Sequence, residues 1–116
     1  MKKNKAIDKN FLKQKPLRKE NLKWTCDGNG SVTLEIENKG VFNRVAQKLL
    51  KKPKISYIHL EEFGSFIWQQ IDGERDIIKI GETVREQFGE KAEPLYERLA
   101  QYFKILEGYG FIIWAD

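Results

Sequence analysis

The run from Phe66 to Arg75 constrains the fold more than any other part of this sequence, because an aromatic-rich helical segment stops there at Asp72-Gly73. Glycine adopts the left-handed conformation of a helix C-terminus at little cost, so the first helix is predicted to end at this dipeptide. Apolar residues then recur three and four positions apart, up to a glycine that precedes the hydrophobic segment Phe111 to Trp114. Three helices are predicted, over residues 62–71, 76–88 and 92–107. This order is typical of a helix-turn-helix followed by a terminal strand.

The preceding part of the chain favours β-structure. Residues 21–24 and 32–36 flank the turn sequence of residues 27–30, whose glycines and asparagine readily adopt positive φ, so the pair predicts a hairpin. Residues 55–60 alternate their side chains and predict a third strand, while residues 41–50 predict a short amphipathic helix with a basic exterior. The expected fold class is α+β and winged helix-turn-helix-like: a three-stranded antiparallel sheet followed by three helices, with an extra short helix between strands two and three.

Composition excludes several classes of protein. The chain has 116 residues and 41% hydrophobic content, enough for a compact core, and no apolar run approaches the roughly 18 residues that span a bilayer. The lysine-rich start does not resemble a signal segment, so we expect a cytoplasmic protein without membrane contact. With one cysteine, Cys26, and one histidine, His59, we expect no internal disulfide, no metal and no cofactor. Nothing resembles a nucleophile–base pair, so we expect no catalytic residues and no enzyme activity.

Positive charge is concentrated near the N-terminus. Residues 1–24 hold nine lysines or arginines against two acids, whereas the rest of the chain is net negative. We predict that residues 1–20 form a flexible basic arm, that removing residues 1–15 leaves the fold intact, and that residues 21–116 form the folded domain. Contact of this arm with an acidic partner or nucleic acid is the alternative. A second basic patch, from Lys39 to Lys54, contains no acid.

Two segments carry more apolar side chains than a single core contact needs. Both faces of the strand predicted over residues 55–60 are apolar, so either both are covered or one is a binding surface. The third helix has a wide apolar stripe, made of Leu95, Tyr96, Leu99, Tyr102, Phe103 and Leu106. This width indicates two surfaces, one that seals the core and one that faces a groove.

In these features the sequence resembles the PqqD-like proteins, which are named for the D protein of pyrroloquinoline quinone synthesis and are also called ribosomal-peptide recognition elements. The resemblance covers about residues 22–113. It rests on Leu60, the segment from Phe66 to Arg75 with its Asp72-Gly73, the apolar positions of the second helix, and Gly110-Phe111-Ile112. It implies a winged-helix-like protein that binds the leader segment of a precursor peptide and presents it to a modifying enzyme, commonly a radical S-adenosylmethionine protein. The basic arm and the helix over residues 41–50 depart from the family pattern.

The resemblance also implies where the peptide binds. The leader adds as an extra strand on the third strand and lies against the third helix. The corresponding peptide-binding positions are Ile55, Ser56, Tyr57, Ile58, His59 and Leu60 on the strand, and Leu95, Leu99, Tyr102, Phe103 and Leu106 on the helix. The basic patch from Lys39 to Lys54 would steer an acidic leader. An exposed strand edge can also pair with a second copy, which leaves a homodimer open.

The competing function is that of a winged-helix DNA-binding regulator. In such a protein the groove-reading helix needs a cationic face to neutralise phosphates. The second and third helices instead mix acids with bases: Asp76, Glu82, Glu86, Glu93, Glu97 and Glu107 against Lys79, Arg85, Arg98 and Lys104. We therefore expect no nucleic acid partner. A structural subunit of a larger complex is the remaining alternative, and binding of a short isolated peptide would distinguish the peptide chaperone from it.

Overall fold

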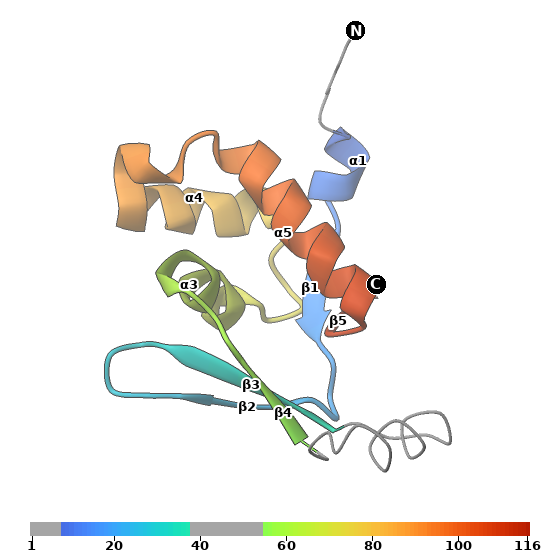
Figure 1. Ribbon diagram of the computed structural model, residues 1–116. Coiled ribbons are helices and arrows are strands. Elements are labelled where there is room, and N and C mark those ends of the chain that lie inside the picture. Colours follow the sequence, from blue (N-terminus) through green and yellow to red (C-terminus); the bar gives the residue numbers. More distant parts are fainter. Residues whose placement is uncertain (1–7, 38–54) are drawn as a thin grey trace, which may run out of the picture. The chain divides into compact units, whose positions relative to one another are not determined.

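The computed structural model describes residues 8–37 and 55–116, and the short helix predicted over residues 41–50 lies outside the described residues. The described chain is α+β (Figure 1). It divides into two compact units: unit 1 comprises Met1–Glu20 and Phe66–Asp116, and unit 2 comprises Asn21–Ser65. Each unit is described by itself below.

Unit 2 is built on a three-stranded antiparallel sheet, as the sequence predicts. Its strands are β2 (Lys23–Cys26), β3 (Val32–Glu37) and β4 (Ile55–His59), and β3 lies in the centre. The β2–β3 turn is closed by Asp27, whose Oδ1 accepts hydrogen bonds from the amides of Asn29 and Ser31 at 2.8 and 2.9 Å. Because side chains alternate along a strand, Val32 and Leu34 lie on the same face of β3, and both are fully buried in the core.

Ser65 extends the pairing of β3 with β4 by one residue. The amide of Leu60 donates to the carbonyl of Val32 at 2.9 Å. The return bond is relayed by the hydroxyl of Ser65, which accepts from the amide of Val32 at 2.9 Å and donates to the carbonyl of Leu60 at 3.0 Å. A buried serine early in helix α3 (Glu62–Gln70) thereby satisfies the backbone where β4 ends.

The helices of unit 1 begin and end close to the predicted positions. Helix α4 (Ile77–Phe88) starts after Asp76, whose Oδ1 accepts from the amide of Lys79 at 2.8 Å. A 3-10 turn η1 (Gly89–Ala92) leads to α5 (Leu95–Tyr109), which ends at Gly110 with a φ of 78°. From Phe66 to the end of α5, the main buried apolar side chains are Ile67, Trp68, Ile71, Ile77, Ile80, Val84, Leu95, Leu99, Phe103 and Leu106.

Residues 8–20 differ from the flexible arm that the sequence predicts. They form α1 (Lys9–Leu12) and β1 (Lys15–Arg18), and β1 pairs antiparallel with the terminal strand β5 (Ile112–Ala115). Leu12 is buried, and the ring of Phe11 meets Trp114 edge-on at 5.3 Å. The few apolar side chains of this lysine-rich segment pack against residues near the C-terminus. Contacts between segments so far apart in sequence cannot be predicted from local periodicity. Whether residues 21–116 fold alone stays a prediction.

Candidate functional site

Strand β4 has an open edge. Among residues 8–37 and 55–116, β4 pairs with β3 alone. Since Leu60 bonds to Val32, the antiparallel alternation directs the N–H and C=O groups of Ser56 and Ile58 toward β3. The same groups of Ile55, Tyr57 and His59 then point away from the sheet. The edge therefore offers three residues whose backbone is positioned to pair with another strand.

The side chains along this edge are unusually apolar for an exposed strand. Tyr57 is 59% exposed, Ile55 is 36% exposed and Ile58 on the opposite face is 37% exposed. His59 is also exposed, while Ser56 and Leu60 are half-buried. Neither face of β4 is therefore fully covered, and the expectation that one face serves as a binding surface stays a prediction.

His59 is held by a neighbour on β3. Its Nδ1 lies 2.9 Å from the hydroxyl oxygen of Thr33, which is directly across the strand pair. Glu35 is across from Tyr57 in the same register, so Thr33 and Glu35 share the face of His59 and Tyr57. The hydrogen bond fixes the orientation of the imidazole at one end of the open edge.

The helix positions that the resemblance implies are mostly covered. Leu95, Leu99, Phe103 and Leu106 are buried in unit 1, and Tyr102 is half-buried with its ring edge-on to Phe103 at 5.2 Å. Burial raises the pKa of the Tyr102 phenol above its ordinary value. These side chains build the core of unit 1, because they form the inner stripe of α5. A role for them in peptide binding stays a prediction.

The exposed apolar residues of α5 are different ones. Ile105 is 49% exposed and Tyr109 is 71% exposed. They follow Tyr102 at spacings of three and seven, so the three residues share one side of the helix. Ile105 and Tyr109 are not among the positions predicted from the sequence, although continuing the stripe from Tyr102 at helical spacing leads to both.

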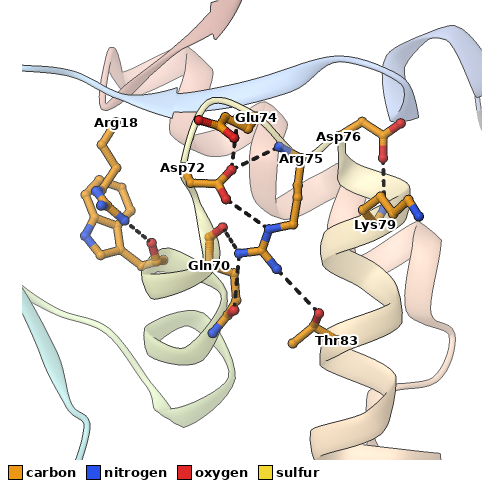
Figure 2. A network of polar contacts seen from close by, with 9 residues as sticks. Arg18, Gln70, Asp72, Glu74, Arg75, Asp76, Lys79 and Thr83 are labelled. Atoms are coloured by element: carbon orange, nitrogen blue, oxygen red, sulfur yellow. Dashed lines mark hydrogen bonds and ion pairs between the residues drawn. The ribbon is translucent and has the colours of Figure 1, made fainter.

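The Asp72-Gly73 motif ties the end of α3 to the start of α4, as Figure 2 shows. Arg75 Nε donates to Asp72 Oδ2 at 3.1 Å, and its Nη2 donates to the carbonyl of Gln70 at 2.6 Å. Asp72 Oδ1 accepts from the amides of Glu74 and Arg75 at 2.9 and 3.0 Å. These backbone bonds, that of Arg75 foremost, lower the pKa of the Asp72 carboxyl. The motif is a structural connection rather than a reactive pair.

A second arginine binds the same helix end. Arg18 of β1 donates from Nη1 to the carbonyl of Trp68 at 2.8 Å, and its guanidinium lies 6.0 Å from the centre of the Trp68 ring (Figure 2). Burial is the main cause that lowers the pKa of Arg18. Two arginines thus satisfy carbonyls at the C-terminal end of α3, where the helix dipole favours positive charge.

Metal-binding clusters and membrane-spanning helices are both absent from the described residues. In the part of the chain that the structure describes, no three His, Cys, Asp or Glu side chains gather closely enough to hold a metal ion. Within the same residues, no helix is long and apolar enough to cross a bilayer. Cys26 is exposed with a free thiol.

An open strand edge with exposed apolar side chains is typical of a small binding domain. The sequence profile of the family described as coenzyme PQQ synthesis protein D (PqqD) matches residues 30–112. Because this match spans most of the chain, the chain belongs to the PqqD family, and the resemblance drawn from the sequence is confirmed. No curated protein and no solved structure matches the chain. Family membership supports a role in PQQ synthesis, a ribosomal-peptide pathway, as a small accessory binding protein rather than a catalyst.

Proposed function

We propose that the chain is a peptide chaperone, which binds the leader segment of a ribosomally made precursor peptide and presents it to a modifying enzyme of the radical S-adenosylmethionine class. The observation that carries the proposal is the open edge of β4, where Ile55, Tyr57 and His59 direct their backbone groups away from β3. Membership of the PqqD family supports the same function. The winged-helix-like character of the fold, the cytoplasmic location and a homodimer stay predictions.

The leader binds by adding a strand to the sheet of unit 2. Each outward residue of β4 offers one N–H donor and one C=O acceptor, and the added strand supplies the matching groups. A hydrogen bond contributes about 0.5–1.5 kcal/mol net, so the six bonds at three residues contribute about 3–9 kcal/mol. Because association also costs translational and rotational freedom, further contacts are needed to reach the roughly −8 kcal/mol of a micromolar complex. The exposed side chains of Ile55, Tyr57 and Ile58 supply apolar area to the remainder.

The helical side of the site is proposed separately. The resemblance assigns it to α5, and Tyr102 is the one member of that set that is not fully buried. Replacing Leu99 by Ala removes a fully buried side chain, so this change is expected to lower stability first. Replacing Tyr102 by Ala tests peptide contact more directly, and we expect it to weaken binding by about 1–3 kcal/mol if Tyr102 lines the site.

The matched pair Tyr57→Pro and Tyr57→Thr tests the strand edge. Both variants lose the aromatic ring, but only proline also removes the outward amide, and a proline at an edge position leaves the β3–β4 bonds in place. The ligand is the precursor peptide encoded beside this protein, titrated by calorimetry with chelator present. We expect Tyr57→Pro to bind at least about 1 kcal/mol more weakly than Tyr57→Thr.

Thermal melting and Lys79→Ala serve as controls, because Lys79 is an exposed residue on α4 in unit 1. Lys79→Ala should bind like the unaltered protein. Folded Tyr57→Pro and Tyr57→Thr variants of equal affinity would rule out strand addition at β4. A complete absence of heat with the unaltered protein would end the chaperone proposal.

A further inference from the structure

The outer face of the unit 2 sheet changes character from strand to strand. Here the outer face is the one that carries Lys23 and Thr25 of β2, Thr33, Glu35 and Glu37 of β3, and Ile55, Tyr57 and His59 of β4. The first two strands are polar on this face, as expected for a sheet surface in water. Among the residues of the three strands that the structure describes, large apolar side chains appear on this face only at β4, the strand with the open edge, where Tyr57 is the most exposed. This placement indicates that the outer face of β4 is covered when an added strand is bound.

An added strand necessarily places side chains on this face. Strand side chains alternate, so every second residue of the peptide lies beside Ile55, Tyr57 and His59. Directly opposed side chains come within about 4.5–5.5 Å at their Cβ atoms, and an aromatic residue pairs best with aromatic or β-branched partners. The ring of Tyr57 is therefore positioned to select an aliphatic or aromatic residue of the peptide.

His59 supplies a second, polar position on the same face. The hydroxyl of Thr33 engages Nδ1 at 2.9 Å, which leaves Nε2 as the nitrogen that a ligand meets. When the hydroxyl donates to Nδ1, the neutral ring carries its proton on Nε2, and the charged ring also has a donor there. In this tautomer and in the charged ring, the group at Nε2 is a donor, which suits a carboxylate, whereas a neutral ring that donates from Nδ1 to the hydroxyl has an acceptor at Nε2. Glu35 and Glu37 lie one strand further in on the same face, and Lys23 is directly across from Glu35.

We propose that the protein reads its leader on this outer face, selecting an extended segment with an aliphatic or aromatic side chain beside Tyr57 and a carboxylate beside His59. The proposal rests on the peptide function proposed above and assigns two specificity-determining residues to it. An acidic ligand also agrees with the sequence of residues 39–54, which contains lysines and an arginine but no acid.

A displayed library of random linear peptides tests the proposal without knowledge of the natural ligand. The library is selected in parallel on the unaltered protein, on Tyr57→Thr and on His59→Val, because both replacements are β-branched and retain the strand. Thermal melting and amide chemical shifts verify that each variant is folded. We expect peptides from the unaltered protein to combine an acidic residue with aliphatic or aromatic residues at alternate positions. Tyr57→Thr should lose the apolar preference, and His59→Val should lose the acidic one.

Calorimetry with one enriched peptide gives the quantitative arm. Changing its acidic residue to the corresponding amide should weaken binding to the unaltered protein about five- to tenfold, and should have no effect on His59→Val. Enrichment of the same pattern by all three proteins would overturn the inference while leaving the peptide function intact. A lack of any enrichment by the unaltered, folded protein would instead count against the peptide function itself.

Discussion

Gly81 shows how a single residue sets the spacing between two helices. A Cβ atom built on Gly81 would lie 2.7 Å from Cε1 of Tyr96 and 3.0 Å from Cδ1 of Leu99. The Tyr96 ring has little freedom to retreat, because its hydroxyl donates to the carbonyl of Ile78 at 3.3 Å. The absence of a side chain at Gly81 therefore lets α4 and α5 approach closely.

We predict that Gly81→Ala destabilises the protein. Overpacking costs about 1–3 kcal/mol, and the better helix propensity of alanine recovers only about 0.5–1 kcal/mol. Gly108→Ala is the matched control, since Gly108 is also helical and its Cβ would meet nothing within 4 Å. Denaturant unfolding should show a loss for the first variant and a gain for the second. A gain in stability for both variants would mean that the Tyr96 ring moves away from the new methyl group without loss of stability.

Asp72 is a second residue from whose environment a pH dependence of stability is predicted. Its pKa is lowered in the folded protein, so its stabilising contribution is present above the ordinary value of 3.8 and is lost as the pH falls through the folded value. Asp72→Asn retains an oxygen that can accept the backbone bonds but removes the charge. The side chain is 43% exposed, so the effect is a small one. Melting temperatures should favour the unaltered protein at pH 7, and the difference should shrink below about pH 4. A difference independent of pH would exclude the charge as its source.

Among the elements, α1 and β1 show most clearly what tertiary packing adds. Four residues of α1 have little helix stability of their own. They are held because Leu12 is buried and because the ring of Phe11 contacts both Trp114, at 5.3 Å, and the ammonium group of Lys104, at 5.3 Å from the ring centre. Tertiary contacts also explain Pro16 in β1. Its nitrogen, which carries no proton, faces away from β5, so no β1–β5 hydrogen bond is lost. Its carbonyl points the same way and accepts from the amide of Gly73 at 2.9 Å.

We predict that Leu12→Ala lowers the free energy of unfolding by about 2–3 kcal/mol, because it removes a buried side chain at the junction of α1 with the rest of unit 1. The exposed neighbour Lys13, replaced by Ala, should change stability by no more than about 0.5 kcal/mol. Denaturant unfolding of both variants provides the measurement. If Leu12→Ala and Lys13→Ala were equally stable, Leu12 would contribute no packing energy, and the flexible arm that the sequence predicts would be the better description.

At the scale of the molecule, the two units differ in how local their contacts are. Unit 2 is one continuous segment with a tight β2–β3 hairpin, whereas unit 1 joins the beginning of the chain to its end through β1 and β5. Pairing between such distant segments requires closure of a long loop and is therefore a slow, non-local event. The proposed peptide edge lies in the unit with the continuous sequence, and the charged connection of Asp72 with Arg75 lies in the other.

The sequence by itself determined the local elements and the family. Asp72-Gly73, the N-cap at Asp76 and the turn at Asp27 act within a few residues, so the three helices and the three-stranded sheet follow from periodicity and turn chemistry. Only the tertiary structure decided which apolar side chains are covered. It buried Leu95, Leu99 and Phe103, left Tyr109 exposed, and ordered residues 8–20 against the C-terminal strand. The reason is physical: a stripe on a helix or a few apolar residues in a basic segment specify a tendency to be buried, but burial depends on partners that are distant in sequence.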